Sequence, residues 1–134
     1  MNILWVSTCL AQVDTQTSSF LPSIEAWYEI IPQKPDSILG EIDKLLENHR
    51  TELTDIELTY VYHLKSDGHY YLNDIRKSDE AILQALSHAP ENFHPSKMID
   101  IYNSHGQNLD FLGMLPEAIE SYQKGLAISK QIND

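Results

Sequence analysis

Residues 102–125 read YNSHGQNLDFLGMLPEAIESYQKG, and this stretch decides the fold. Large residues at Tyr102 and Leu109 are seven positions apart, a spacing that places both on one face of an amphipathic helix. Gly113 predicts the end of that helix, and Pro116 fits the first turn of the next one. The stretch therefore predicts a helix, a short turn and a second helix.

Small residues are placed where these two helices would meet. Gly106 and Ala118 have little or no side chain, so the helices can cross closely at these positions. Tyr102, Leu109 and Tyr122 would fill the space around the crossing.

A weaker copy of the pattern precedes this one. Gly68 and Gly106 are 38 residues apart, and Ala81 and Ala118 are 37 apart. A period of this length is typical of stacked helical repeats. The repeated positions that we expect to pack are Leu64, Gly68, Tyr71, Ala81, Tyr102, Gly106, Leu109, Ala118, Tyr122 and Gly125.

These residues resemble the tetratricopeptide repeat, whose first helix carries a large residue, a glycine and another large residue. Its second helix carries a small residue, an aromatic residue and a small residue, as at 118, 122 and 125. The resemblance implies an all-α, right-handed helical-repeat solenoid of about three antiparallel helix pairs. The pairs would cover about 22–50, 54–89 and 95–131 within one domain, 22–134, and the first pair is degenerate. Ordinary helical hairpins would produce a similar pattern.

The N-terminal residues 1–21 have a different composition. An apolar stretch at 3–11 is followed by a polar run, which resembles a truncated signal peptide with a polar linker. Met1 and Asn2 lack the basic charge of a signal peptide. The chain would be periplasmic or otherwise extracytoplasmic if this stretch is a signal remnant, and cytoplasmic if it is not.

Composition excludes several classes of function. The 134 residues include 20 acidic and 9 basic side chains, a formal net charge of −11, which repels phosphate backbones and disfavours nucleic acid as a partner. A single cysteine, Cys9, excludes an internal disulfide framework and a multi-cysteine zinc site. No apolar run approaches the length of a membrane span.

The sequence offers no recognisable catalytic constellation. It contains neither a glycine-rich phosphate loop nor a nucleophile elbow. His63 and His69 are six residues apart, a spacing that does not place them on one helical face as metal ligands. We therefore predict a protein that is not an enzyme and that holds no cofactor or metal.

The resemblance also implies a binding surface, because the first helix of each tetratricopeptide repeat lines a concave groove. The positions carried over from the family are Tyr62, Lys65, His69 and Asn73 in one repeat, and Asp100, Asn103, Gln107 and Asp110 in the next. Spacings of three and four residues place each set along one helical stripe. Polar side chains in such a stripe suit hydrogen bonds to a peptide.

Two functions follow as expectations. The first is a protein-interaction module that binds a peptide or a partner protein through the groove or by end-to-end stacking. Stacking includes a homodimer formed through an uncapped repeat end. The alternative is an extracytoplasmic sensory region of a larger bacterial signalling protein, with a catalytic output domain outside this chain.

Overall fold

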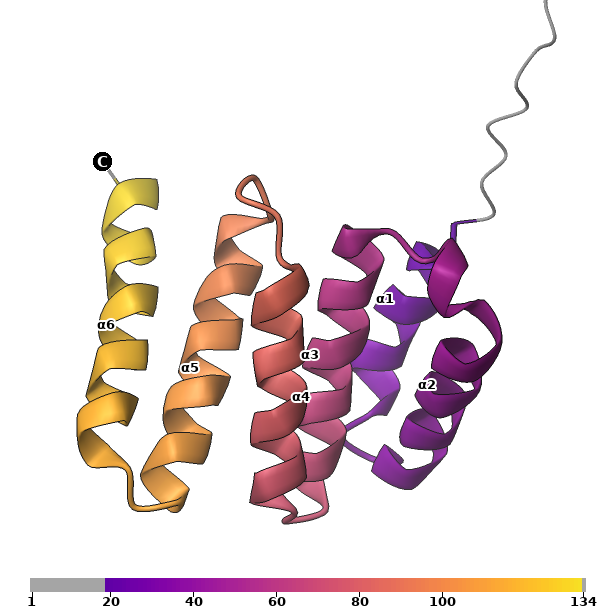
Figure 1. The fold of residues 1–134 in the computed structure, drawn as a ribbon, viewed down its shortest axis with the longest axis horizontal. Helices are drawn as coiled ribbons and strands as arrows, with labels where there is room; N and C mark the ends of the chain where they lie inside the picture. Colours follow the sequence, from indigo (N-terminus) through magenta and orange to yellow (C-terminus); the bar gives the residue numbers. More distant parts are fainter. Residues whose placement is uncertain (1–18, 134) are drawn as a thin grey trace, which may run out of the picture.

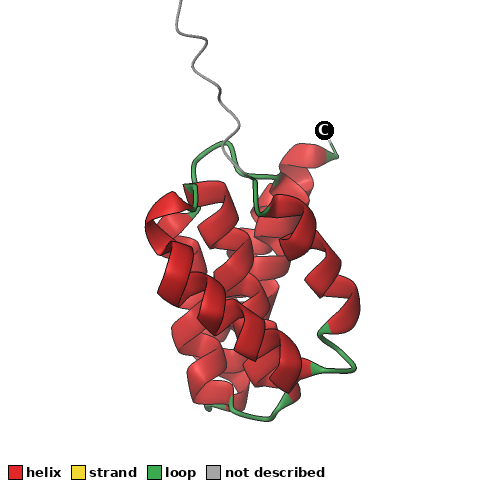
Figure 2. Cartoon of the chain, turned by 90° about the vertical axis from the view of Figure 1, so that its right-hand side faces the viewer, coloured by secondary structure: helices red, strands yellow, loops and turns green. Residues whose placement is uncertain are grey.

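The computed structural model describes residues 19–133, which form six α-helices and one short 3-10 helix (Figures 1 and 2). The elements are α1 (Leu21–Ile30), α2 (Pro35–His49), η1 (Arg50–Glu52), α3 (Asp55–Tyr71), α4 (Ile75–His88), α5 (Pro95–Phe111) and α6 (Leu115–Ile132). This part of the chain contains no strand, which confirms the all-α prediction for it. Residues 1–18 of the predicted signal remnant and linker, including Cys9, lie outside the described residues.

The helices follow one another along the long axis of the molecule, from α1 and α2 at one end to α6 at the other (Figure 1). The most extensive packing joins α3 to α4 and α5 to α6, and further contacts join α2 to α3 and α4 to α5. Figure 2, viewed from the α1–α2 end, shows helices joined by short loops. From α2 onward, each helix packs mainly against its neighbours in sequence, whereas α1 packs more extensively against α3 than against α2.

Local hydrogen bonds explain where two of these helices begin. The Thr54 hydroxyl accepts a hydrogen bond from the Glu57 backbone N–H at 3.1 Å and donates one to the Glu57 carboxylate at 3.3 Å. Thr54 and Glu57 together therefore cap the N-terminus of α3. Asp74 caps α4 in a similar way by accepting a hydrogen bond from the Lys77 N–H at 3.2 Å.

The turns after α3 and α5 and the starts of the helices share one spacing along the chain. Asn73 and Gly113 follow α3 and α5 with positive φ values of 61° and 78°, the left-handed conformation that commonly ends a helix. These two residues are forty positions apart, and so are the starts of α3 and α5. The starts of α2, α4 and α6 are also spaced by forty residues. The predicted spacing of 37 or 38 residues is wrong.

The residues at the two helix crossings show why the prediction failed. Gly106 lies where α5 crosses α6, and a Cβ atom added there would come within 2.6 Å of the Tyr122 ring. The forty-residue period places Ser66 at the position of Gly106, and Ser78 at that of Ala118. Ser66 and Ser78 are both buried, with their hydroxyl oxygens 3.0 Å apart. Serine thus serves as the small residue in the earlier pair.

Gly68 and Tyr71 therefore have roles other than those predicted. Gly68 is buried against α2 rather than at the crossing with α4, and a Cβ atom added to it would lie 2.8 Å from the Leu39 side chain. Tyr71 was expected to pack inward, but 49% of its surface is exposed at the end of α3. Both differences follow from a two-residue error in the register of α3.

The other predicted packing positions are buried or partly buried. Leu64, Ala81, Gly106, Leu109, Ala118 and Gly125 are buried, and Tyr102 and Tyr122 are partly buried. The core itself is concentrated in α1 to α5, where Ile24, Ile42, Leu64, Ile82 and Ile101 are all completely buried. Full burial of each such side chain contributes about 1.5–3 kcal/mol to the hydrophobic stabilisation.

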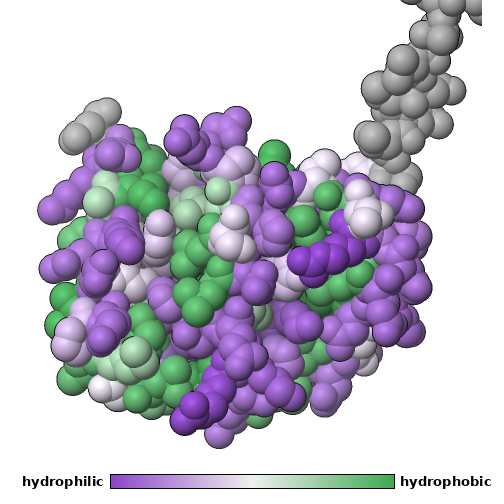
Figure 3. Space-filling view, viewed as in Figure 1, coloured by the Kyte–Doolittle hydropathy of each residue, from purple (hydrophilic) through white to green (hydrophobic). Residues whose placement is uncertain are grey.

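Large apolar side chains remain exposed around the α5–α6 turn, the lower left of the molecule in Figure 3. They are Phe111, Met114, Leu115 and Ile119, and we call them the α5–α6 patch. None of the helices in residues 19–133 is both long enough and apolar enough to cross a membrane.

Candidate functional site

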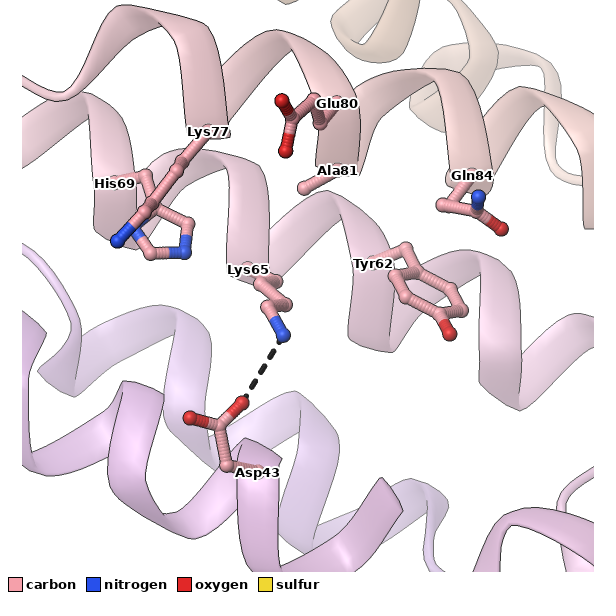
Figure 4. Close-up of a pocket in the computed structure, with 8 residues that line it drawn as sticks. All are labelled: Asp43, Tyr62, Lys65, His69, Lys77, Glu80, Ala81 and Gln84. Carbon is pink, nitrogen blue, oxygen red and sulfur yellow. Dashed lines mark hydrogen bonds and ion pairs between the residues drawn. The ribbon is translucent and has the colours of Figure 1, made fainter. Parts of the chain in front are cut away.

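A groove with a cavity volume of about 540 Å³ lies between α2 and α4, and α3 forms its floor (Figure 4). Both outer helices pack against α3, and the space between them stays open. The groove is lined by Asp43, Tyr62, Lys65, His69, Lys77, Glu80, Ala81 and Gln84. Sites for small ligands have volumes of roughly 300–1,000 Å³, so the groove has sufficient volume for part of a peptide.

Charged groups in the groove form weak pairs. The Lys65 Nζ atom lies 3.0 Å from Asp43 Oδ1, in an ion pair that crosses from α3 to α2 (Figure 4). Lys77 Nζ lies 3.8 Å from Asp74 Oδ2, and both of these side chains are well exposed. Exposed ion pairs contribute about 1 kcal/mol or less, so a ligand can replace either one at small cost.

Tyr62 forms a fixed wall of the groove. Its side chain is only 6% exposed, and the Arg50 guanidinium donates a hydrogen bond to its hydroxyl oxygen. Its ring stacks on the ring of His88, with centroids 5.6 Å apart and an interplanar angle of 3°. The sequence predicted a partner-binding residue here, and the structure shows that Tyr62 is largely buried.

His69 lies beside both lysines of the groove. Burial lowers the pKa of its imidazole, and the charge of Lys65 lowers it further. The neutral ring therefore predominates at pH 7, and it offers one hydrogen-bond donor and one acceptor to a ligand.

A second surface lies on the opposite side of α3. It comprises Tyr60, His63, Asp67 and Tyr70 of α3, and Asp100, Asn103, Gln107 and Asp110 of α5; we call it the α3–α5 face. Each member on α3 precedes its counterpart on α5 by forty residues. Positions 60 and 62 differ by about 200° around a helix, so this face and the groove point in opposite directions.

Three polar side chains at this face link α1 to α3, and of these His63 is buried while Tyr28 and Asp67 are partly buried. The Tyr28 hydroxyl lies 3.0 Å from His63 Nδ1, and His63 Nε2 lies 3.7 Å from Asp67 Oδ1. The Lys97 ammonium lies above the Tyr28 ring, 4.2 Å from its centroid, and so adds a cation from α5.

Burial favours the neutral form of all three groups. It lowers the pKa of His63 to about 4, with a further contribution from the charge of Lys97. It raises the pKa of Asp67 to about 7, although Lys97 opposes this shift. It also raises the pKa of Tyr28 well above its ordinary value, and the negative charge of Asp67 adds to this effect.

The structure places seven of the eight predicted contact residues on two separate surfaces. Tyr62, Lys65 and His69 line the groove, whereas Asp100, Asn103, Gln107 and Asp110 lie on the α3–α5 face. Asn73 lies in the exposed turn after α3, where its positive φ serves the chain reversal. The predicted residues therefore do not form one continuous groove.

Sequence reasoning missed residues on both surfaces. His63 and Asp67 are four positions apart, a spacing that places them together on one helical face and could have revealed the pair. Lys77 and Glu80 complete the groove from α4, but only the packing of α4 against α3 identifies them.

Within residues 19–133, no three His, Cys, Asp or Glu side chains are grouped so that they could hold a metal ion. No protein-family model, curated protein or solved structure matches the chain. Inferences about function therefore depend on the geometry and charge of the two surfaces.

Proposed function

We propose that the chain is a protein-interaction module: a right-handed stack of three antiparallel helix pairs of tetratricopeptide type that binds an extended peptide in the groove. The observation that carries the proposal is the groove itself. Polar side chains from α2, α3 and α4 face an open space there. Several of them, including Lys65 and Asp43, are held only by exposed ion pairs.

The chemistry of the groove suits a peptide of mixed polarity. Lys65 and Lys77 can receive a carboxylate, while Glu80 can pair with a basic side chain. His69 and Gln84 can donate hydrogen bonds to backbone carbonyls and accept them from backbone amides. The largely buried side chain of Tyr62, stacked on His88, closes the groove wall between these groups.

The test starts with peptides selected from a displayed random library against the full chain, followed by fluorescence anisotropy on the selected sequences. The double variant Lys65→Ala/His69→Ala should weaken binding at least about tenfold, since it removes one charged and one neutral partner. The matched double variant Asn103→Ala/Gln107→Ala, on the α3–α5 face, should bind with unchanged affinity. Loss of affinity in the second variant alone would move the peptide site to the α3–α5 face.

The α5–α6 patch favours a second mode of interaction, end-to-end stacking. Leu115 and Ile119 are 56% and 55% exposed, and they are one helical turn apart on α6. Exposed apolar surface of this kind is often covered by a partner. We propose that a second copy of the chain covers the patch at high concentration. Light scattering across a dilution series tests this, and Ile119→Glu should abolish any dimer; a monomer at every concentration would exclude the stacking mode.

A further inference from the structure

A small polar cavity of about 100 Å³ lies on the α3–α5 face, between α3, α4 and α5. Its lining consists of Ser66, Asp67, Tyr70, Tyr71, Ser78, Ser104, Gln107 and Asn108. Asp67 is the one charged residue among them. A water molecule occupies roughly 30 Å³ of liquid, so the cavity has room for a small head group with one or two methylene groups.

The deepest polar groups of the cavity are already paired with one another. The Asn108 amide donates a hydrogen bond to Ser78 Oγ at 2.9 Å, and Ser78 Oγ lies 3.0 Å from Ser66 Oγ. Among the described residues, the side chains of Asp67, Ser104 and Gln107 form no such hydrogen bond, so their oxygens remain available to a ligand as acceptors.

Asp67 also forms no ion pair with a lysine or arginine within the described part of the chain, although the charge of Lys97 favours its ionised form. His63 Nε2 is 3.7 Å away, which is too long for a hydrogen bond, and the lowered pKa of His63 keeps this ring neutral at pH 7. Lys97 lies over the Tyr28 ring and forms no ion pair within 4.0 Å of a described carboxylate. The Asp67 side chain keeps 26% of its surface exposed, so a cation from outside can reach it.

We infer that this cavity binds a primary alkylammonium group, which places its charge against Asp67 and donates hydrogen bonds to Asp67, Ser104 and Gln107. An ammonium has three donors, which matches these three acceptors. The aromatic side chains of Tyr70 and Tyr71 also line the cavity, and aromatic rings favour a nearby cation and apolar methylene groups. A guanidinium is broader and has five donors in a planar fork, so it fits this cavity less well.

This inference does not rest on peptide binding in the groove. The two sites lie on opposite sides of α3, and Asp67 does not line the groove. The alkylammonium can belong to a lysine side chain of a partner protein or to a free amine, and both share the chemistry that the cavity recognises.

The test is a titration of the full, isotopically labelled chain followed by amide NMR at pH 8. Most Asp67 carboxylates are ionised at this pH, although burial and the charge of Asp100 raise their pKa to about 7 and Lys97 opposes the shift. The probes are Nα-acetyl-lysine methylamide, its uncharged norleucine analogue and n-butylamine. We expect saturable shifts of the Gln107 and Ser104 signals with both amines and none with the norleucine analogue. Tighter binding of the lysine derivative indicates a protein partner, and equal or tighter binding of butylamine indicates a free amine.

The variant Asp67→Asn should weaken binding of both amines at least about tenfold, because the charge-assisted hydrogen bond is lost. Asp43→Asn removes an acidic group from the groove and should leave amine affinity unchanged. Gln107→Ala provides a second test at an exposed position, where we expect little effect on stability, and it should weaken binding a few-fold. Binding of the norleucine analogue, or unchanged amine affinity in Asp67→Asn with a native circular dichroism spectrum, would overturn the inference.

Discussion

Replacing Asp67 by asparagine should stabilise the protein at pH 8 and leave its stability nearly unchanged at pH 4. Burial raises the pKa of this carboxyl from 3.8 to about 7 in the folded chain. Between these two pH values, the folded state holds a proton that the unfolded state has released. Stability therefore falls as the pH rises through this window, and the full penalty is present above pH 7.

The size of the effect follows from the shift. About three pKa units at roughly 1.4 kcal/mol each give an upper figure of about 4 kcal/mol. The side chain is 26% exposed, and solvent screens part of the penalty, so we expect a gain of about 2 kcal/mol. Asparagine has the same shape as the neutral acid and no charge to desolvate, so it should retain the packing and lose the penalty.

Urea unfolding followed by far-UV circular dichroism at pH 8 and pH 4 measures this difference. The control is Asp110→Asn, which removes a charge from an exposed position on α5 and so accounts for the general benefit of reducing a net charge of −11. It should change stability by less than about 0.5 kcal/mol at either pH. An Asp67→Asn variant that is less stable than the parent at pH 8 would refute the reasoning, because it would show that the carboxylate is a stabilising partner.

Three further predictions concern the helices. Gly40 lies inside α2 with nothing near its missing Cβ, so Gly40→Ala should add about 0.5–1 kcal/mol of stability and raise the melting temperature. Gly106→Leu should cost about 1–3 kcal/mol or more, since even a Cβ atom would collide with Tyr122; an unchanged melting temperature would argue against this crossing. Thr54→Ala should lower the free energy of unfolding in urea by about 1 kcal/mol, because the cap to Glu57 is lost. An unchanged free energy of unfolding would contradict that role.

The helices themselves were predictable because their signals are local. Apolar spacing sets each buried face, and Thr54, Pro95 and Gly113 mark helix ends through short-range chemistry. The crossing of α5 and α6 was also predictable, since Gly106 and Ala118 are buried where the sequence placed them. These features require knowledge of only one helix or one helix pair.

The register of the preceding pair was not predictable from glycine alone. Two small residues, Ser66 and Gly68, lie two positions apart on opposite sides of α3, and each is buried against a different helix. Which of them faces α4 depends on the position of Leu39 in α2, a contact between distant parts of the chain. Aligning Gly68 with Gly106 therefore placed Gly68 at the crossing with α4, where the structure has Ser66.

In the candidate sites, too, features of a single helix were predictable and contacts between helices were not. Lys65 and His69 were predicted as binding residues and line the groove, but α2 and α4 complete that groove in a way that no local pattern specifies. The environment of Asp67 depends on residues of α4 and α5 as well as its own helix. Its raised pKa is therefore a property of the packed molecule.

One structural marker would have given the correct register from the sequence. In the two C-terminal pairs, the turn after the first helix contains a residue with a positive φ, a conformation that favours glycine or asparagine. Both are present here, at Asn73 and Gly113. Counting back seven residues from Gly113 gives Gly106, and counting back seven from Asn73 gives Ser66, which is the buried crossing residue. Because a two-residue error rotates a helix by about 200°, the choice of marker decides which side of α3 is assigned to binding. In degenerate helical repeats, the turn is thus a better origin for counting than the small residue at the crossing.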